Sequence, residues 1–262
     1  MERWRGKVAI VTGASSGIGA ALVKDLVHYG VQVVALARRD DRLKEIRDSL
    51  PAGQKALVHP IKCDITQEED IKSAFAWVEK NLGGVDILVN NAGVLRMTAA
   101  LKPDNSQDIK DTINTNVIGL AFCTREAYHS MKRRNVSGHI FLVNSLAGHR
   151  VPDFGPSMSS SVYAASKYAV TALTEIYRQE LANAGTKIKV TSISPGPVDT
   201  EIFPGAINMI KDKVKILDPE DISESIIYAL STKPHVQVQD IILRPLAVDM
   251  PSLVKQLTTE KK

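Results

Sequence analysis

The stretch Thr12-Gly13-Ala14-Ser15-Ser16-Gly17-Ile18-Gly19 lies between an apolar run at residues 8–11 and an amphipathic segment at residues 17–29. This order predicts a buried strand, a glycine-rich turn and a helix. Backbone N–H groups at the start of such a helix can bind a pyrophosphate, and glycines let the phosphates come close. The spacing is Gly-x-x-x-Gly-x-Gly, not the common Gly-x-Gly-x-x-Gly, and a plain tight turn is the alternative. We expect a phosphate-binding loop whose contacting residues are Gly13, Ser15, Ser16, Gly17, Ile18 and Gly19.

Outward from this loop, short apolar runs alternate with amphipathic segments along the chain. We expect strands at residues 8–11, 31–37, 57–61, 87–89, 139–144, 189–193 and 241–243. Helices are expected at residues 17–29, 66–82, 109–134, 163–184 and 221–231. Thr66 and Glu69 should form a capping box, and Asp218-Pro219-Glu220 should start the last helix. This alternation is typical of an α/β fold with a parallel sheet covered on both faces, and we expect one domain over residues 1–262.

Composition excludes several classes of protein. The chain has 262 residues, 44% of them hydrophobic, and a formal net charge of +4 that is scattered along it. These values argue against disorder and against nucleic-acid binding. No apolar run reaches the roughly 18 residues of a membrane helix, and the first residues lack the pattern of a signal peptide, so we expect a cytoplasmic protein. Cys63 and Cys123 lack metal-site spacing, so both are expected to be reduced core residues, and no metal is expected.

Two further motifs follow the glycine-rich stretch, namely Asn90-Asn91-Ala92-Gly93 and Tyr163-Ala164-Ala165-Ser166-Lys167. With these three motifs in this order, the chain resembles the short-chain dehydrogenase/reductases from about residue 5 to residue 246. The resemblance implies a Rossmann-type, doubly wound sheet of seven parallel strands. It also implies NAD(P)-dependent oxidation of alcohols or reduction of carbonyls.

The end of the second expected strand bears on the choice of dinucleotide. Ala37 stands where an acid would bind the ribose hydroxyls of NAD, and Arg38 offers donors that match a phosphate. Ser15 can add a hydroxyl contact, and Arg39 can stack on adenine. A solvated basic cap on the following helix is the alternative. We expect NADP as the cofactor.

Tyr163 and Lys167 are four residues apart and therefore lie on one face of the expected helix. A free tyrosine has a pKa near 10, and a nearby ammonium group favours the phenolate. The resemblance implies that Tyr163 exchanges a proton with the substrate oxygen and that Lys167 also holds the nicotinamide ribose. We therefore expect both residues to be catalytic and to contact the cofactor.

The same resemblance assigns two more catalytic residues. Ser145 follows the fifth expected strand and would hydrogen-bond the substrate oxygen, with Ser159, Ser160 and Ser161 as competing candidates. Asn116 would distort its helix and seat a water that links Lys167 to solvent. Asn114 competes for this role, but the Asn-x-x-Gly spacing favours Asn116.

The remaining cofactor contacts follow from the same resemblance. Asp64 and Ile65 match the adenine-binding pair, although Asp64 can instead cap a helix near Thr66. Asn90 and its neighbours would tie the central sheet together and close over the cofactor, and the loop at residues 195–200 would contact the nicotinamide amide. Beyond the phosphate loop and the arginines, the expected contacts are Asp64, Ile65, Asn91, Ala92, Gly93, Pro195, Gly196, Val198 and Thr200.

Apolar side chains gather where the substrate would bind. Residues 201–217 have the character of a mobile apolar lid, which indicates a hydrophobic substrate. The lid carries Ile202, Phe203, Ile207, Met209 and Ile210, and the expected wall consists of Leu95, Met97, Val151, Phe154 and Met158. Ordinary core packing is the alternative for each of them.

Three stretches, at residues 123–128, 148–151 and 167–175, resemble the member-eleven branch of the family, which includes insect farnesol dehydrogenases. This implies an NADP(H)-dependent oxidoreductase for a lipophilic alcohol such as farnesol and its aldehyde or ketone. The alternatives are a ketosteroid or xenobiotic carbonyl reductase and a catalytically weak dinucleotide-binding sensor. Family members pair through the two long helices, here at residues 109–134 and 163–184, so a homodimer or homotetramer is expected.

Overall fold

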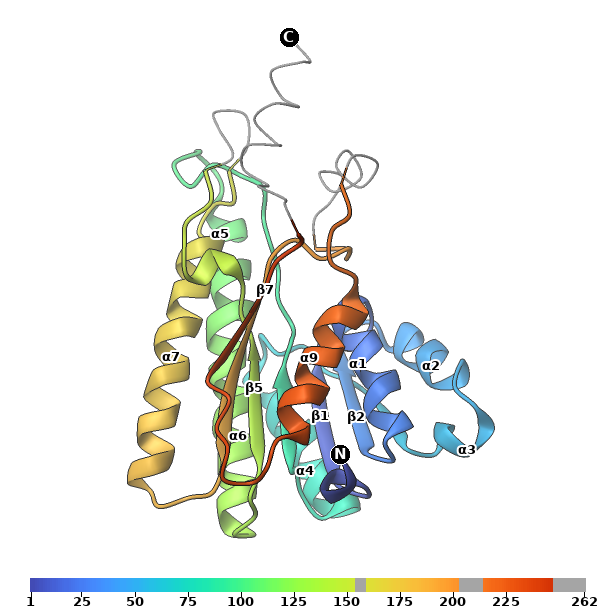
Figure 1. Cartoon of the computed structure of the whole chain (residues 1–262). Coiled ribbons are helices and arrows are strands. Elements are labelled where there is room, and N and C mark those ends of the chain that lie inside the picture. The colour runs from blue at the N-terminus through green and yellow to red at the C-terminus, as the bar shows by residue number, and fades with distance from the viewer. Residues whose placement is uncertain (154–158, 203–213, 247–262) are drawn as a thin grey trace.

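Seven parallel strands form one sheet in the computed structural model, which describes residues 1–153, 159–202 and 214–246 (Figure 1). The strand order is β3-β2-β1-β4-β5-β6-β7. The strands are β1 (Val8–Thr12), β2 (Gln32–Ala37), β3 (Val58–Lys62), β4 (Ile87–Asn90), β5 (His139–Val143), β6 (Lys189–Pro195) and β7 (Asp240–Leu243). The doubly wound Rossmann-type sheet expected from the sequence is confirmed, with strand ends within two residues of their expected positions.

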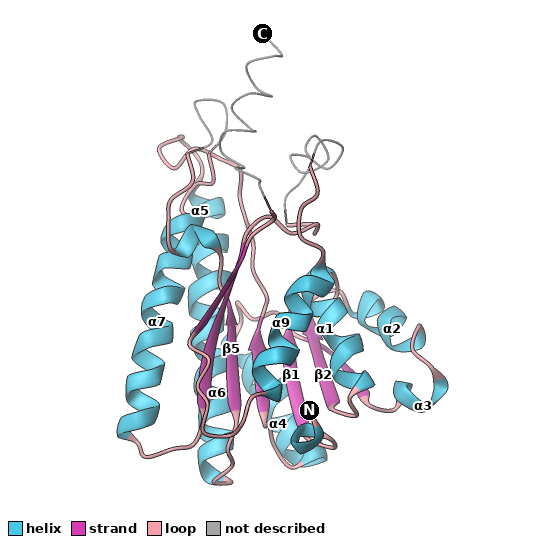
Figure 2. Ribbon diagram, viewed as in Figure 1, coloured by secondary structure: helices cyan, strands magenta, loops and turns pink. Residues whose placement is uncertain are grey.

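Helices cover both faces of this sheet (Figure 2). They are α1 (Gly17–His28), α2 (Asp40–Asp48), α3 (Ala52–Lys55), α4 (Glu68–Leu82), α5 (Ser106–Ile113), α6 (Leu120–Arg133), α7 (Tyr163–Asn183) and α9 (Pro219–Ser231). One hydrophobic core lies between the sheet and α1, α2 and α9, and a second lies between the sheet and α4, α6 and α7. Strand β1 shows how one strand serves both cores, because Ala9 and Val11 join the first and Val8 and Ile10 join the second.

The order of the strands reverses beside β1, which pairs with β2 on one side and with β4 on the other. In open α/β sheets, ligands bind outside the carboxyl ends of the strands at such a switch point. The glycine-rich loop follows β1 and the Asn-Asn-Ala-Gly motif ends β4. Two of the three motifs therefore meet at this crevice.

The helices differ from the expectations at a few points. The helix expected at residues 109–134 consists of α5 and α6 joined by a π-helical turn, Asn114–Gly119, which lies where a distortion at Asn116 was expected. The expected capping box of Thr66 and Glu69 is absent, because α4 begins at Glu68 and the Thr66 hydroxyl donates instead to Asp64 Oδ1 at 2.8 Å. Helix α2 was considered only as the helix that follows Arg38 and Arg39, and α3 was not expected. At α9 the expected cap is confirmed, since Asp218 and Asp221 form a capping box.

A membrane-spanning helix and a metal site can be looked for only in the part of the chain that the structure describes. Among those residues, none of the helices is both long and apolar enough to cross a bilayer. The same residues contain no group of three acidic, histidine or cysteine side chains suited to holding a metal ion. Cys63 and Cys123 are free and buried.

Candidate active site

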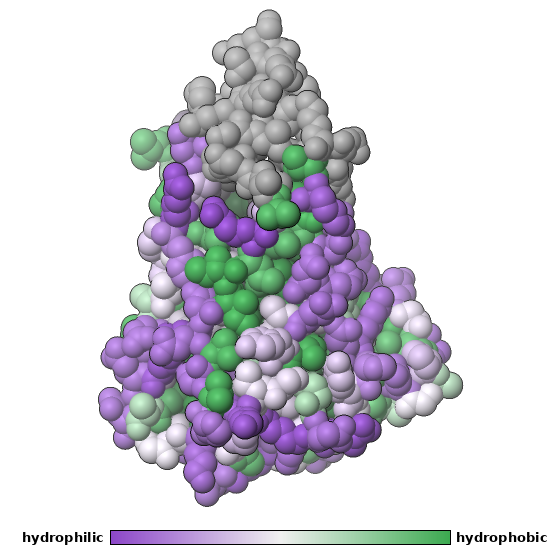
Figure 3. All heavy atoms as spheres, in the orientation of Figure 1, coloured by the Kyte–Doolittle hydropathy of each residue, from purple (hydrophilic) through white to green (hydrophobic). Residues whose placement is uncertain are grey.

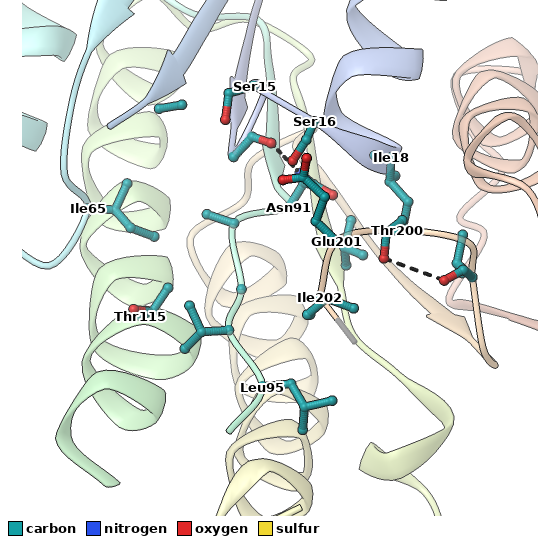
Figure 4. Close-up of a pocket in the computed structure, with 18 of the residues that line it drawn as sticks. Ser15, Ser16, Ile18, Ile65, Asn91, Leu95, Thr115, Thr200, Glu201 and Ile202 are labelled. Atoms are coloured by element: carbon teal, nitrogen blue, oxygen red, sulfur yellow. Dashed lines mark hydrogen bonds between the residues drawn. The ribbon is translucent and has the colours of Figure 1, made fainter. Parts of the chain in front are cut away.

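A cleft of about 510 Å³ opens at the carboxyl edge of the sheet, around the switch point beside β1. It is lined by residues from the glycine-rich loop, the ends of β2, β4, β5 and β6, and the start of α7. Figure 4 shows Ser15, Ser16 and Ile18 at one side of it and Leu95, Thr115 and Ile202 further along. The cleft thus brings together segments that are far apart in the sequence.

Nearly all the residues proposed from the sequence line this cleft. They are Gly13, Ser15, Ser16, Gly17, Ile18, Arg38, Arg39, Asp64, Ile65, Asn91, Ala92, Gly93, Ser145, Tyr163, Lys167, Pro195, Gly196, Val198 and Thr200. Gly19 and Asn116 lie just behind the lining. A Cβ at Gly19 would clash with the carbonyl oxygen of Gly13, so Gly19 lets the helix pack closely under the loop.

The glycine-rich loop is held against β4 by the Asn-Asn-Ala-Gly motif. Asn91 Nδ2 donates to the carbonyl oxygens of Thr12 at 2.9 Å and Gly13 at 3.2 Å. The backbone N–H groups of Asn91 and Ala92 both donate to the Thr12 hydroxyl at 3.0 Å. Gly13 has a φ of +65°, and a Cβ there would lie 2.7 Å from the Cα of Ala92. A side chain at this position would therefore be strained and would also push the two segments apart.

Asn90 ties the sheet to a helix and does not line the cleft. Its side chain is buried, and its Nδ2 donates to Thr124 Oγ1 on α6 at 2.9 Å. Asn91 joins the end of β4 to the loop after β1, and Asn90 joins β4 to α6, which agrees with the expectation that the motif ties the central sheet together. That the motif closes over the cofactor stays a prediction.

Asn116 lies in the middle of the π-helical turn, as the expected distortion requires. Its Oδ1 accepts from the Val94 N–H at 2.8 Å, and its Nδ2 donates to the Val94 carbonyl at 3.0 Å and to Ser166 Oγ at 3.0 Å. Gly119 ends the turn against Ile65, where a Cβ would clash with the carbonyl oxygen. The buried Asn116 amide therefore fixes the strand-β4 loop relative to α7.

Tyr163, Ser145 and Lys167 meet at the other end of the cleft. Ser145 Oγ accepts from the Ala147 N–H at 3.1 Å, which leaves its hydroxyl proton free to donate to the phenol oxygen of Tyr163. Lys167 Nζ lies over the Tyr163 ring, 5.7 Å from its centre, and donates to the Val143 carbonyl at 2.8 Å. The competing serines at residues 159–161 do not line the cleft, and Ser160 contributes its carbonyl to the start of α7.

The protonation of this pair differs from the expectation of a lowered phenol pKa. Burial raises the pKa of Tyr163 to about 12, and the hydrogen bond with Ser145 opposes only part of that increase. Burial also lowers the pKa of Lys167 to about 8. The Lys167 ammonium is directed at the Val143 carbonyl and not at the phenol oxygen, and burial is the main cause of both shifts.

At the opposite end, Arg39 is bound to the phosphate loop. Its Nε and Nη2 donate to Ser15 Oγ at 3.1 and 3.0 Å, and Nη2 also donates to Ser16 Oγ at 2.8 Å. Arg38 lines the cleft as well, and its charge contributes to lowering the pKa of Asp111, whose main cause is the hydrogen bond from Arg96. The two arginines therefore put positive charge at the end of β2 that faces the cleft.

Asp64 forms the local contact with Thr66 that was the alternative to adenine binding. Its Oδ1 accepts from both the backbone N–H and the hydroxyl of Thr66, at 3.0 and 2.8 Å. It also lines the cleft next to Ile65. Asp64 therefore both stabilises the local turn and lines the cleft.

Glu201, Arg96 and Thr115 line the cleft but were not among the site residues expected from the sequence. Arg42, which lies outside the lining, binds Glu201. Arg96 is neutralised by Asp111 at 2.8 Å and Asp108 at 3.6 Å. No pattern marks these residues, except that Glu201 directly follows the expected nicotinamide loop.

The expected apolar wall is only partly present among the described residues. Leu95 and Ile202 line the cleft, whereas Met97 and Val151 lie outside its lining and Val151 is largely exposed. Phe154, Met158, Phe203, Ile207, Met209 and Ile210 fall outside the described residues. Both ends of the segment at residues 201–217 are nevertheless attached to the cleft, because Leu217 pairs with Val198 and accepts from the Asp199 N–H at 2.8 Å.

Comparisons with known proteins agree with this geometry. The family described as short chain dehydrogenase matches residues 7–209. A farnesol dehydrogenase of Aedes aegypti is 53% identical over 246 residues, covering 94% of this chain and 98% of that protein. Dehydrogenase/reductase SDR family member 11 of Mus musculus is 48% identical over 254 residues, covering 94% of this chain and 96% of that protein.

Two solved structures are similar over most of their length. The closed form of a serine dehydrogenase complexed with NADP+ has a TM-score of 0.82 and 29% identity, covering 92% of this chain and 96% of the other. An alcohol dehydrogenase from the archaeon Thermococcus sibiricus complexed with 5-hydroxy-NADP has a TM-score of 0.79 and 26% identity, covering 93% and 98%.

Proposed function

The chain belongs to the short-chain dehydrogenase/reductase family, and from this premise we propose that it interconverts a lipophilic alcohol, such as farnesol, and its aldehyde or ketone with NADP(H). Members of the family are oxidoreductases that use NAD or NADP. The observation that carries the proposal is one cleft with Tyr163, Ser145 and Lys167 at one end and a pair of arginines at the other. This arrangement suits an enzyme better than a sensor, because a sensor needs the phosphate loop but not the proton-transfer residues.

NADP is the dinucleotide that the charges favour. Ala37 offers no carboxylate to repel a 2′-phosphate, and Arg38 and Arg39 supply guanidinium donors at the same place. Ser15 Oγ already accepts from Arg39, so it orients that guanidinium toward the loop. The two solved relatives described above contain NADP or a derivative of it.

The residues present also fit the rest of a dinucleotide. Gly13 and Gly17 leave open a cradle in which a Cβ would clash with Ala92 and Thr200, respectively. We propose that Asp64 and Ile65 bind the adenine, that Lys167 binds the nicotinamide ribose, and that the loop of Pro195, Gly196, Val198 and Thr200 contacts the nicotinamide amide. The remaining proposed contacts are Ser16, Ile18, Gly19, Asn91, Ala92 and Gly93.

The proton step falls to Tyr163. A nicotinamide held by Lys167 and the loop of Pro195, Gly196, Val198 and Thr200 would supply or accept the hydride. With its pKa raised to about 12, Tyr163 is a neutral phenol near neutral pH, the form that donates a proton to a carbonyl oxygen during reduction. In the oxidative direction the same oxygen has to take the proton of the alcohol. We therefore expect oxidation to speed up as the pH rises, since a larger fraction of Tyr163 is then deprotonated.

Ser145 and Asn116 support that step. The Ser145 hydroxyl donates toward the Tyr163 oxygen and stabilises the phenolate, and from this place it can also hydrogen-bond the substrate oxygen. Asn116 holds the Val94 backbone and Ser166, which lies one residue before Lys167. We propose that Asn116 positions Lys167 and seats the water that connects it to solvent.

An apolar substrate fits the described part of the substrate end. Leu95 and Ile202 line it, and Arg96, which also lines the cleft, is paired with Asp108 and Asp111. A carboxylate or phosphate substrate would have to break those pairs. We propose that residues 201–217 act as a lid, because Ile202 contacts the cleft at one end of the segment and Leu217 is held by the Val198 loop at the other.

The assembly and the compartment are extensions of the same proposal. Apolar side chains are exposed on the two long helical segments, Ile118 on the π-helical turn and Tyr168 and Ile176 on α7. Burying them against a second copy would form the proposed homodimer or, with a further interface, a homotetramer. The cytoplasm remains the predicted compartment.

The decisive test of this function is nicotinamide absorbance with all-trans-farnesol and either NADP or NAD, and with farnesal and NADPH for the reverse direction. We expect turnover in both directions and a higher kcat/KM with NADP than with NAD. Turnover confined to steroid or small dicarbonyl substrates would contradict the proposed substrate class. A higher kcat/KM with NAD would contradict the proposed cofactor.

A further inference from the structure

Glu201 lies across the adenosine end of the cleft and holds two arginines. Its Oε2 accepts from Arg39 Nη1 at 2.7 Å and its Oε1 accepts from Arg42 Nη1 at 2.6 Å. Figure 4 shows Glu201 extending from the loop after Thr200 toward Ser15 and Ser16. Residues more than 150 positions apart in sequence are thus joined at the mouth of the phosphate loop.

This carboxylate occupies a donor of Arg39, one of the two arginines proposed above to bind a 2′-phosphate. Nε and Nη2 of Arg39 donate to Ser15 and Ser16. The remaining nitrogen, Nη1, is the donor that an incoming anion would use, and it already donates to Glu201. Arg42 sits beside it with both oxygens of Glu201 within 2.9 Å of Nη1. Next to the cleft, a shallow basic hollow is lined by Arg38, Arg39, Asp40, Asp41, Arg42 and Lys62.

The ion pairs contribute little to folding stability. The side chains of Arg39 and Arg42 are each 44% exposed and that of Glu201 is 56% exposed. Exposed ion pairs are weak because water competes for both partners. The hydrogen bonds from Arg39 and Arg42 lower the pKa of Glu201, so the side chain is an anion at neutral pH. A carboxylate held by two guanidinium groups resembles, in charge and in geometry, the way a phosphate would be held there.

We propose that Glu201 is an internal competitor for the 2′-phosphate of the nucleotide, and that it tunes the preference between NADP and NAD. A bound 2′-phosphate would take over Arg39 and Arg42 and release Glu201, because two anions cannot share these donors without repulsion. A nucleotide without this phosphate leaves the pairs intact. Glu201 therefore lowers affinity for NADP selectively. The inference rests on the proposed function, since it assumes that the cleft binds a dinucleotide in the family's orientation.

The test is the dissociation constant of NADP and of NAD, measured by titration calorimetry for the wild type, Glu201→Gln and Glu175→Gln. Glu175 is a matched control, since its side chain is 55% exposed, pairs with Arg178 at 2.7 Å and lies on α7 away from the cleft lining. In Glu201→Gln we expect the ratio of the NAD to the NADP dissociation constant to rise about three- to tenfold, the range of one or two exposed ion pairs. Affinity for NAD should stay within about twofold, and Glu175→Gln should match the wild type.

Each outcome decides between the two claims. An unchanged ratio in Glu201→Gln overturns the competition, and a lower ratio shows instead that Glu201 holds the arginines ready for the phosphate. If the wild type prefers NAD but the ratio still rises in Glu201→Gln, the proposed cofactor is wrong and the competition stands. If no variant binds either nucleotide, both claims fail. Equal thermal unfolding of the three proteins excludes a folding defect as the cause.

Discussion

Lys167 lies over the ring of Tyr163, with Nζ 5.7 Å from the ring centre, and does not hydrogen-bond its hydroxyl. The lysine is instead directed at the carbonyl of Val143, the last residue of β5. Burial works against both charged forms, since it raises the pKa of Tyr163 to about 12 and lowers that of Lys167 to about 8. Burying the charged form of either residue therefore lowers the stability of the fold, a cost that an apolar pair at these positions would avoid.

The cost at Lys167 predicts that its removal stabilises the fold. Lys167→Met keeps most of the buried side-chain volume but removes the buried ammonium, and we expect the free energy of unfolding at pH 7 to rise by about 1–2 kcal/mol. The lost hydrogen bond to Val143 offsets part of the gain. Urea unfolding of Lys167→Met and the wild type measures the difference.

The pH dependence of that gain identifies its cause. The folded-state pKa of about 8 lies below the ordinary value of 10.5, so the unfolded chain binds more protons between these values. Wild-type stability should therefore increase across this window, and the advantage of Lys167→Met should shrink. Lys72→Met, at an exposed site on α4, is the control and should change stability little at any pH. A Lys167→Met variant that is less stable than the wild type at pH 7 would refute this explanation.

A buried histidine at the far end of the sheet predicts acid sensitivity. Thr191 Oγ1 donates to the Val238 carbonyl at 2.7 Å, so it accepts from His139 Nε2 at 2.8 Å. His139 Nδ1 is buried and has no hydrogen-bond partner among the described residues, and burial lowers the pKa of His139 well below its ordinary value of 6.5. Protonation would place an unpaired charge in the core.

Stability should consequently fall as the pH drops below about 6.5, with a limiting slope of about 1.4 kcal/mol per pH unit for one proton. The unfolded chain binds that proton and the folded chain does not. Urea unfolding between pH 7 and 5 should show a shallower slope for His139→Gln than for the wild type. His129→Gln, at an exposed position on α6, should keep the wild-type slope. Parallel curves for all three proteins would mean that His139 is not the group responsible.

The phosphate loop predicts a sharp dependence on one glycine. Gly13→Ala adds a Cβ at a φ of +65° that would lie 2.7 Å from the Cα of Ala92. We expect the affinity for dinucleotides to fall at least about tenfold and the free energy of unfolding to fall by about 1–3 kcal/mol. Gly53→Ala is the matched control, because its Cβ would meet nothing within 4 Å. Wild-type nucleotide affinity in Gly13→Ala would contradict the assigned loop.

The sequence predicted the parts of this protein that depend on local pattern. The periodicity of the apolar runs gives the strands because a strand buried on both faces is apolar throughout, as in β1. The four-residue spacing of Tyr163 and Lys167 places both at one face of α7. Ser145 was separable from its competitors because it lies two residues after β5, at the edge where ligands bind.

Side-chain contacts between segments that are distant in the sequence could not be predicted from the sequence. The pairing of Glu201 with Arg39 and Arg42 depends on how the loop after β6 folds over the end of β2. The capping box at Thr66 failed because Asp64 supplies a nearer acceptor for the same hydroxyl. The raised pKa of Tyr163 was also not predictable, because its main cause is burial, which the sequence pattern does not report.

The central claim, that Tyr163 exchanges the proton with the substrate, is tested most directly by comparing Tyr163→Phe with Tyr168→Phe. Both variants lose one phenol hydroxyl from the same helix, but Tyr168 is 43% exposed and lies outside the cleft lining. With an alcohol or carbonyl that the wild type turns over, we expect kcat/KM to fall by about 100- to 10,000-fold in Tyr163→Phe and to be unchanged in Tyr168→Phe. The NADP dissociation constant should stay within a few-fold in both variants. A Tyr163→Phe variant that keeps more than about a tenth of wild-type kcat/KM would contradict the account.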